Sequence, residues 1–394
     1  MLNTLRLFLA ICLFLASLLA VLKPPTHTLW KAAIAVQECG HLLVLPCLLL
    51  VYLGFRTGLP GRMGSGIFLA AALLYASPLL RAMATAKQLE KKFAVGFGKS
   101  PPGHAALSRA STLDWMQLAL GVPIMPAQPK TICYKASTLA TTVTASATRE
   151  KSPFAMDFYA SAKPNAPCVL VIHGGGWDSG ERSEMEPLNR FLVADGYAVA
   201  SIDYRLAPLY QYPAPVEDVE AAIAFLRSHA GELGIDPSNL VLLGRSAGGQ
   251  IALQAAYQAS GNPGIKGVIA YYAPADMIYG YSIPCSPLIL DSRKLMEAYL
   301  GGAYDQVPGN YRASSPLEAL KADSPPTLLL HGRTDVLVSF QHTVHMEAKL
   351  NKLGVPHFIV DLPWATHGYD FFFSGPGSQI SLYFIERFLA KVTQ

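Results

Sequence analysis

Charged residues are scarce in this chain of 394 residues: they make up 15% of the sequence, against about 25% in an average soluble protein. Hydrophobic residues make up 51%, and no internal repeat or low-complexity segment is present. A disordered chain, a collagen-like chain and a protein that coats nucleic acid are therefore excluded, because they need more charge, repeats or a lower apolar content. The composition predicts a folded protein with no nucleic-acid partner.

Cysteine is also rare, with six residues in the whole chain. No two of them form a C-x-x-C pair, and none stands with histidines at the spacing of a metal site. This pattern favours buried free thiols over a disulfide framework, and it predicts no bound metal.

The net charge of +4 is unevenly distributed along the chain. Residues 1–110 contain eleven Lys or Arg and two Asp or Glu, a net charge of +9, whereas residues 111–394 contain twenty and twenty-five, a net charge of −5. The positive charge therefore belongs to an apolar N-terminal region, and it is no argument for a nucleic-acid ligand. A slightly acidic globular domain follows.

Three long apolar stretches lie in this N-terminal region, near residues 4–22, 32–53 and 63–80. A helix needs about 20 apolar residues to cross the hydrocarbon core of a bilayer, so two stretches are long enough and the third is marginal. We predict a region of two or three transmembrane helices over residues 1–86, with the lipid bilayer as a partner. A cleaved signal peptide is the alternative for the first stretch, although Leu18 makes a poor cleavage site.

Basic residues near the ends of the predicted spans favour one orientation. With three spans, six basic residues share a side with the globular domain and three lie on the opposite side, and cytoplasmic ends are usually the richer in Lys and Arg. The domain is therefore predicted to be cytoplasmic, although a two-span arrangement would change the count. The six are Lys23, Lys31, Arg81, Lys87, Lys91 and Lys92, and the three are Arg6, Arg56 and Arg62.

Two ionisable residues, Glu38 and His41, lie within the second apolar stretch. At a separation of three residues they share one face of a helix, and ionisable side chains inside a membrane often mark functional sites. The alternative is a mutually satisfied pair near an interface. Residues 87–130, which follow the spans, are predicted to be a basic helix and a linker, and they are a candidate cap for the domain.

Residues 131–394 alternate short apolar strands with amphipathic helical segments, which is the pattern of a mostly parallel sheet with helices on both faces. A helix is predicted over residues 215–230, where acidic side chains occupy the first turn. The predicted strands are residues 169–172, 197–202, 240–243, 267–271, 327–330 and 357–360.

The strand at residues 240–243 runs into the sequence Gly-Arg-Ser-Ala-Gly, centred on Ser246, and a helical run follows directly. A G-x-S-x-G sequence between a strand and a helix is typical of a tight turn that exposes a serine hydroxyl above a sheet. The N-terminus of the following helix adds positive potential where an oxyanion would develop. Ser246 is therefore a candidate nucleophile.

A second glycine-rich sequence, HGGGW at residues 173–177, also follows an apolar strand. Consecutive glycines allow backbone N–H groups to approach a substrate carbonyl oxygen without interference from side chains. Donors fixed at such a position lower a reaction barrier by about 3–4 kcal/mol each. The sequence predicts an oxyanion hole, and a flexible glycine loop is the alternative.

A serine nucleophile needs a base, and the base needs an orienting carboxylate. His367 and Asp335 each follow a predicted strand, and the chain order Ser, Asp, His is the one used by the α/β-hydrolase fold. His173 and His331 begin loops and are expected to form structural hydrogen bonds. His342 and His345 are predicted to lie on the surface of a helix, and Asp370 is expected to point away from the base.

Five ordered motifs together resemble the α/β-hydrolase esterases of the hormone-sensitive-lipase-like group. They are HGGGW at residues 173–177, DYRLAP at 203–208, GRSAGG at 244–249, HGRTD at 331–335 and His367-Gly368. The resemblance covers roughly residues 150–392 and implies an acyl-enzyme on Ser246. It further implies that Gly175, Gly176 and the N–H of Ala247 form the oxyanion hole, and that Asp203 and Arg205 form a structural pair.

These features predict a membrane-anchored serine carboxylesterase that needs no metal or organic cofactor. The walls of the substrate pocket are predicted to include Trp177, Tyr272 and an insertion at residues 277–290, which favours uncharged esters of short to medium acyl chains. An acyltransferase or deacetylase acting on a sugar or lipid acyl group is one alternative. A non-catalytic binding protein on a hydrolase scaffold is another, but such a protein would have lost the serine or the histidine.

Overall fold

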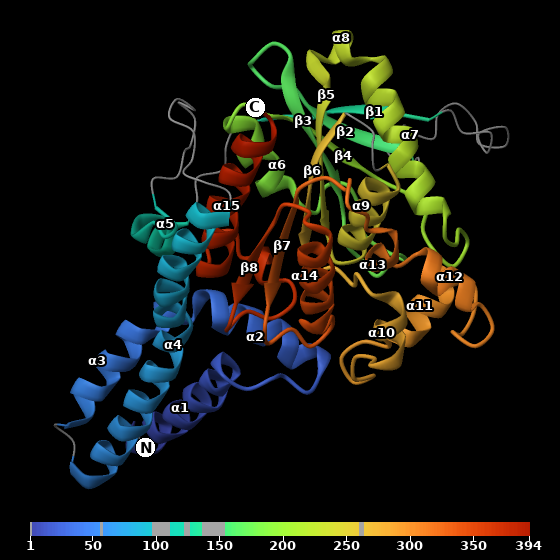
Figure 1. The fold of residues 1–394 in the computed structure, drawn as a ribbon. Coiled ribbons are helices and arrows are strands. Elements are labelled where there is room, and N and C mark those ends of the chain that lie inside the picture. Colours follow the sequence, from blue (N-terminus) through green and yellow to red (C-terminus); the bar gives the residue numbers. More distant parts are fainter. Residues whose placement is uncertain (1, 56–57, 97–110, 122–126, 136–153, 260–263) are drawn as a thin grey trace, which may run out of the picture.

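A computed structural model describes residues 2–55, 58–96, 111–121, 127–135, 154–259 and 264–394. Residues 97–110 and 122–126 of the predicted basic helix and linker (residues 87–130) lie outside this range. A group of helices from the N-terminal region extends away from an α/β domain (Figure 1).

The α/β domain contains one eight-stranded sheet in the order β1-β2-β4-β3-β5-β6-β7-β8. Strands β3 to β8 pair in parallel, and β1 and β2 are added antiparallel at one edge. All six predicted strands are present, whereas the antiparallel strands β1 and β2 were not predicted. The bounds are β1 Lys130–Cys133, β2 Ala155–Tyr159, β3 Ala166–Ile172, β4 Ala198–Ile202, β5 Ile235–Arg245, β6 Ile265–Tyr271, β7 Thr327–Gly332 and β8 His357–Leu362.

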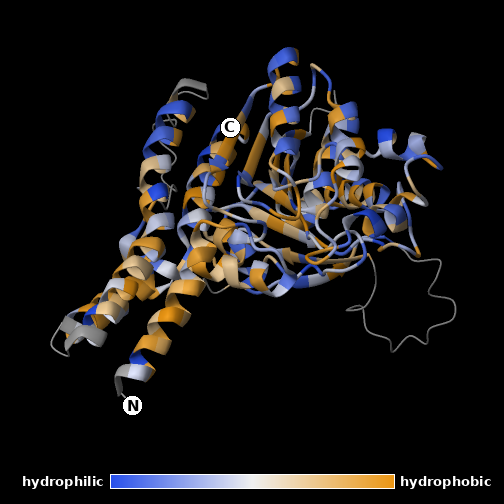
Figure 2. Cartoon of the chain, turned by 90° about the horizontal axis from the view of Figure 1, so that it is seen from below, coloured by the Kyte–Doolittle hydropathy of each residue, from blue (hydrophilic) through white to orange (hydrophobic). Residues whose placement is uncertain are grey.

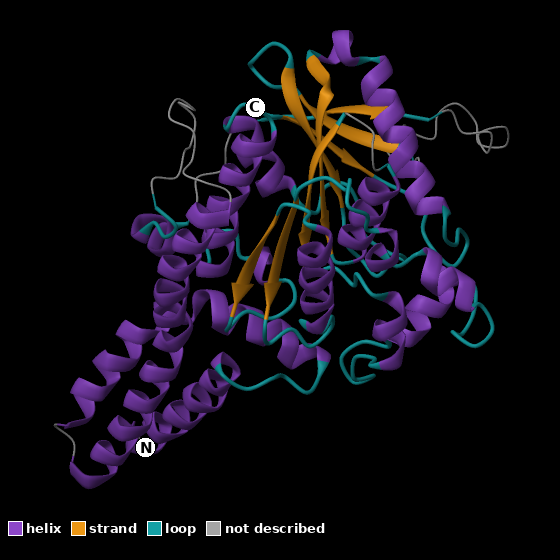
Figure 3. Cartoon of the chain, viewed as in Figure 1, coloured by secondary structure: helices purple, strands orange, loops and turns teal. Residues whose placement is uncertain are grey.

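Helices cover both faces of this sheet (Figure 3), which confirms the predicted layer arrangement. Side chains alternate along β3: Leu170 and Ile172 enter the core beneath α7 (Ala214–Ser228), α9 (Ala247–Gln258) and α14 (Gln341–Leu353). Val169 and Val171 enter the opposite core, beneath α6 (Glu186–Ala194) and α15 (Pro376–Val392). A parallel strand buried on both faces is apolar throughout, which explains why the sequence revealed these strands.

Short helices complete the domain. Helix α8 (Ala230–Leu233) follows α7, and α5 (Trp115–Leu120) precedes β1. An insertion between β6 and β7 carries four more: α10 (Met277–Ser282), α11 (Ser292–Leu300), α12 (Pro308–Ala313) and α13 (Pro316–Ala319).

The N-terminal region consists of α1 (Leu2–Ser17), α2 (His27–Cys39), α3 (Val44–Phe55) and α4 (Gly58–Gly96). Helices α1 and α3 and residues 58–80 of α4 form what we call the helical projection, which is largely hydrophobic in Figure 2. Two stretches, His27–Gly54 and Gly61–Ala94, have the length and hydropathy of membrane spans, and about one third of the residues in each is buried. The core helices of soluble proteins can have the same length and hydropathy.

Two details differ from the predicted spans. Residues 32–53 do not form one helix, because a 3-10 turn at Gly40–Leu43 separates α2 from α3, and α2 lies against the α/β domain (Figure 1). Helix α4 also continues through the predicted boundary at residue 86. Its last turns place Leu89 and Phe93 in the core beneath α15, so the predicted basic helix is part of α4.

Candidate active site

The sharp turn at Ser246 joins β5 to α9. Its backbone has φ 54° and ψ −120°, a conformation that non-glycine residues adopt only under strain. The turn is held because Gly248 packs directly against the loop after β3: a Cβ atom there would lie 2.1 Å from the carbonyl oxygen of His173. This contact explains why small residues flank the serine.

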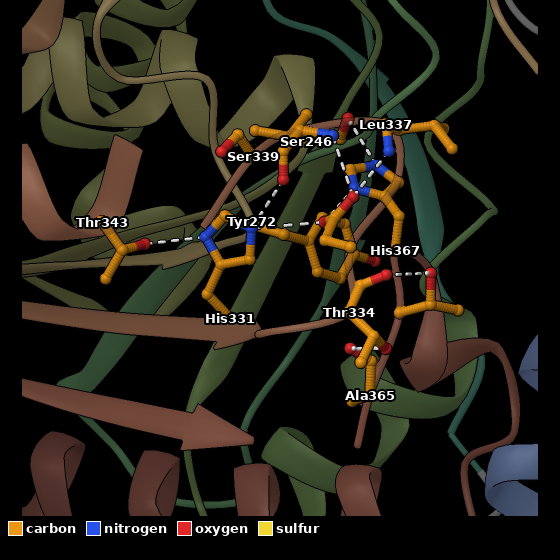
Figure 4. A network of polar contacts seen from close by, with 12 residues as sticks. Ser246, Tyr272, His331, Thr334, Leu337, Ser339, Thr343, Ala365 and His367 are labelled. Carbon is orange, nitrogen blue, oxygen red and sulfur yellow. Dashed lines mark hydrogen bonds and ion pairs between the residues drawn. The ribbon is translucent and has the colours of Figure 1, made fainter. Parts of the chain in front are cut away.

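The three predicted triad residues are in contact with one another, and Ser246 and His367 are labelled in Figure 4. Ser246 Oγ lies 3.0 Å from His367 Nε2, and His367 Nδ1 lies 2.7 Å from Asp335 Oδ2. Because the carboxylate can only accept, Nδ1 carries a proton and Nε2 is free to accept the serine proton. His367 and Asp335 follow β8 and β7, so adjacent parallel strands deliver both to one edge of the sheet.

Asp335 is almost fully buried and accepts several hydrogen bonds. Its Oδ1 accepts from the backbone N–H groups of Leu337 and Val338, both at 2.8 Å. Burial alone would raise the pKa of this carboxyl, but the charge and hydrogen bonds of His367 and His331 lower the pKa below its ordinary value. Asp335 is therefore an ionised orienting group.

His331 forms structural hydrogen bonds, as predicted. Its Nδ1 lies 2.7 Å from Thr343 Oγ1, and its Nε2 lies 3.0 Å from the carbonyl oxygen of Val338 and 3.2 Å from Asp335 Oδ2. The contact between His331 and Thr343 is visible in Figure 4. His331 thus contacts the same oxygen of Asp335 as His367 does.

The glycine loop after β3 lies beside the serine turn. Gly175 and Gly176 have φ of 106° and 59° and line the cavity that contains Ser246. Ala247, the first residue of α9, lines the same cavity. Backbone N–H groups of a positive-φ loop and of a helix N-terminus are the donors that an oxyanion hole requires. His173, at the start of the loop, bonds the carbonyl oxygen of Gly174 and takes no part in the cavity.

The cavity above Ser246 has a volume of about 500 Å³. Trp177 and Tyr272, the predicted wall residues, both line it. Trp177 Nε1–H donates to Gln250 Oε1 at 2.9 Å, and the Tyr272 ring lies 4.2 Å from that of His367. The insertion contributes Ile283, among others, to the wall.

Several wall residues were not predicted from the sequence, among them His27, Trp30 and His342. His27 and Trp30 of α2 line the cavity, although their stretch has the composition of a membrane span. His342 also lines it and is only 3% exposed. The prediction that His342 lies on the surface was wrong, because α14 turns this side chain inward, where Nδ1 accepts from the backbone N–H of Asp276.

The DYRLAP motif does not contain the expected ion pair. Asp203 accepts from Arg182 at 2.6 Å, whereas Arg205 donates to Asp218 at 2.8 Å. The two side chains bond residues outside their own motif, which the spacing of the motif could not reveal. Asp370, by contrast, points away from the base as predicted, and it pairs with Arg245 at 2.6 Å.

Glu38 and His41 do not pair with each other. Glu38 Oε2 accepts from the backbone N–H of Gly377 at 2.8 Å, and His41 Nε2 lies 3.1 Å from the carbonyl oxygen of Leu118. Both contacts are made outside the N-terminal helices. The alternative of a mutually satisfied pair was therefore wrong.

The structure describes all six cysteines, and each is a free thiol. Among the described residues, no group of three or more His, Cys, Asp or Glu side chains is arranged to hold a metal ion. The arrangement offers a nucleophile, a base and backbone donors, which together are suited to acyl transfer through a covalent intermediate.

Comparison with known proteins points to the same chemistry. The family model described as BD-FAE matches residues 156–350. The probable carboxylic ester hydrolase LipM of Mycobacterium tuberculosis (strain ATCC 25618 / H37Rv) is 29% identical over 238 residues, which are 58% of this chain and 54% of LipM. The chain spans about half the length of such curated relatives.

Two solved structures share the fold. A bacterial heroin esterase is 25% identical with a TM-score of 0.54, over 61% of this chain and 80% of that chain. The esterase LipW from Mycobacterium marinum is 20% identical with a TM-score of 0.56, over 79% and 90% of the two chains.

Proposed function

The domain beyond residue 154 is an α/β-hydrolase of the hormone-sensitive-lipase-like carboxylesterase group, and from this premise we propose that the protein is a serine carboxylesterase. The observation that carries the proposal is the pair of contacts at His367, 3.0 Å to Ser246 and 2.7 Å to Asp335, at the floor of a cavity.

The geometry supports a two-step reaction. His367 Nε2 accepts the proton of Ser246 Oγ as that oxygen attacks the ester carbonyl carbon, and the backbone N–H groups of Gly175, Gly176 and Ala247 stabilise the tetrahedral anion. His367 then protonates the departing alcohol, which leaves an acyl-enzyme. Water activated by the same imidazole releases the acid and restores the serine.

The proposed substrates are uncharged esters with short to medium acyl chains. A volume of about 500 Å³ is in the lower half of the range for small-molecule sites. Aromatic and aliphatic side chains such as Trp177, Leu290 and Leu295 line much of the cavity, so burial of an apolar acyl chain there is favourable.

The helical projection is proposed to anchor the enzyme in a membrane. Residues 2–20, 40–55 and 58–80 are continuous helical stretches of about 26–34 Å, close to the hydrocarbon thickness of a bilayer. Their contacts with one another use small residues such as Ala71 and Ala72, as in membrane bundles. Large apolar side chains face outward: Phe8, Leu45, Leu49 and Leu73.

Arg6, the one charged side chain near the start of α1, is satisfied inside the projection. It donates to the carbonyl oxygens of Leu50 and Gly61 and to Ser65 Oγ, as a charge at membrane depth requires. The excess of Lys and Arg at the end of the projection next to the domain supports a cytoplasmic α/β domain.

The test is hydrolysis of p-nitrophenyl esters from acetate to palmitate by the detergent-solubilised full chain and by Ser246→Ala. We expect turnover that depends on Ser246 and is greatest for short to medium chains. Equal rates for the wild type and the variant would contradict an esterase. Release of the acyl group to an added alcohol rather than to water would instead establish an acyltransferase.

A further inference from the structure

Helix α2 lies across the carboxyl ends of β7 and β8, beside the loop that carries His367 (Figure 1). Trp30 Nε1–H donates to the backbone carbonyl oxygen of His367 at 3.0 Å, and the two ring centres are 6.5 Å apart. Trp30 and Ile34 pack with Leu337, which follows Asp335. An N-terminal helix thus contacts the loop of the base directly.

Glu38, two turns further along α2, is fully buried and bonds both ends of this loop. Its Oε1 accepts from Trp364 Nε1 at 3.2 Å, and its Oε2 accepts from the backbone N–H of Gly377 at 2.8 Å. Trp364 comes three residues before His367, and Gly377 is in the first turn of α15. One carboxyl group therefore joins the two segments between which His367 is held.

Two glycines, Gly375 and Gly377, leave the space that the side chain of Glu38 occupies. A Cβ atom at Gly375 would lie 2.4 Å from Glu38 Oε2, and one at Gly377 would lie 2.9 Å from Oε1. The carboxyl group also lies at the N-terminus of the seventeen-residue helix α15, where it accepts from a backbone N–H that has no partner within the helix. Burial raises the pKa of Glu38 to about 8. The sequence around the loop is thus matched to a side chain more than 300 residues earlier.

The α/β domain holds the loop from the other side. Thr334 Oγ1 bonds the carbonyl oxygens of Trp364 and Ala365, each at 2.9 Å (Figure 4). Without Glu38 and Trp30, the loop would keep these contacts but lose those on the α2 side.

We propose that Glu38 is a positioning residue, which fixes the loop of His367 so that Nε2 lies within hydrogen-bonding distance of Ser246. Helix α2 is then part of the active site rather than of the anchor. The inference rests on the proposed function only for the role of His367 as the base.

The experiment compares Glu38→Ala and Glu38→Gln with the wild-type full chain in detergent. Active sites are counted with a fluorophosphonate, which reacts with Ser246 only when the base is in place. For Glu38→Ala we expect kcat per active site and the rate of phosphonylation to fall together by about 10- to 100-fold, the cost of displacing a catalytic group by about 1 Å. KM should change by less than about twofold. Glu38→Gln retains an acceptor for one of the two donors, so its kcat should lie between that of Glu38→Ala and that of the wild type.

Gln37→Ala is the matched control. Gln37 is the buried neighbour of Glu38 on the same helix, but its Nε2 donates to the carbonyl oxygen of Leu19 instead of contacting the loop. Its kcat per active site should stay within about twofold of the wild type. In the combined variant Glu38→Ala/Trp364→Phe, the fold loss of kcat should be smaller than the product of the losses in the two single variants. Both substitutions remove the same contact between Glu38 and Trp364.

A normal kcat per active site and a normal phosphonylation rate in Glu38→Ala would overturn the proposal, even if fewer molecules were folded. The failure of the proposed function is a separate result: a wild-type chain that reacts with the fluorophosphonate but hydrolyses no ester. The phosphonylation rates would test the role of Glu38 in that case too.

Discussion

At the scale of single residues, the ionised state of Asp335 follows from its partners. Two backbone N–H groups occupy Oδ1, and two imidazoles reach Oδ2. An asparagine would keep an acceptor for the backbone donors but would present no negative charge to His367. Its amide would also favour the wrong tautomer of the imidazole.

Asp335→Asn is therefore expected to lower kcat by about 10³- to 10⁴-fold with little change in the thermal unfolding midpoint. Steady-state kinetics and a melting curve measure both quantities. Asp361→Asn is the control, because Asp361 of β8 forms only a partly exposed ion pair with Arg333. A loss of kcat of less than tenfold in Asp335→Asn would argue against the assigned orienter.

His342 gives the protein a pH-dependent stability. Burial, followed by the nearby charge of His331, lowers the pKa of His342 from 6.5 to about 3. Between these values the unfolded chain binds a proton that the folded protein does not, so the free energy of unfolding falls as pH decreases from about 6.5 to 3. The slope from this group is at most about 1.4 kcal/mol per pH unit.

His342→Asn should flatten this part of the stability curve, because asparagine does not titrate. Urea unfolding at a series of pH values from 8 to 4 measures the effect. The curves of the two proteins should run parallel above pH 7, where the wild-type side chain is neutral in both states. Parallel curves down to pH 4 would show that His342 is not the titrating group.

At the scale of elements, the insertion between β6 and β7 sets the size of the cavity. Leu295 of α11 lines the cavity and lies next to the glycine loop: a Cβ atom on Gly176 would be 2.9 Å from its Cδ1. Shortening this side chain enlarges the space beside the oxyanion hole without touching the triad.

Leu295→Ala is expected to move the preferred acyl chain toward longer esters, whereas Leu295→Trp should restrict turnover to acetate and propionate. The ratio of kcat/KM across a series of p-nitrophenyl esters reports the change. Lys294→Ala, an exposed neighbour on the same helix, should leave the series unchanged. An unchanged preference in both Leu295 variants would place the acyl chain elsewhere.

The strands that were predicted from the sequence differ in burial and composition from β1 and β2, which were not predicted. Strands β3 to β7 are buried on both faces over the predicted residues, so they are continuous apolar runs, whereas β8 at the sheet edge is buried on one face. Strand β2 is equally buried but carries Asp157, which pairs with Arg182 at 2.9 Å, and β1 is a half-exposed strand of four residues. Similarly, the sequence marked Glu38 as an unusual ionisable residue in an apolar stretch but gave no sign of its contacts or of those of Trp30, because their partners lie more than 300 residues away.

At the scale of the whole molecule, the exposed apolar surface of the helical projection predicts stable membrane association. Its outward side chains include Phe8, Leu45 and Leu73, each at least 65% exposed. Exposure of such an apolar surface to water is unfavourable, whereas its burial in a bilayer is favourable. The full chain should remain with the membrane fraction after an alkaline carbonate wash, as measured by immunoblotting. Recovery in the supernatant would mean that another protein surface covers the projection.

The position of α2 has a consequence for how this enzyme can be processed. The helix supports the base, yet it lies between α1 and α3 in the chain. A protease that cut after residue 96 would leave α2 with the helical projection, so the α/β domain would be released with Ser246, Asp335 and His367 but without Glu38 and Trp30. Such a fragment would retain the triad residues yet lose the α2 contacts that position His367.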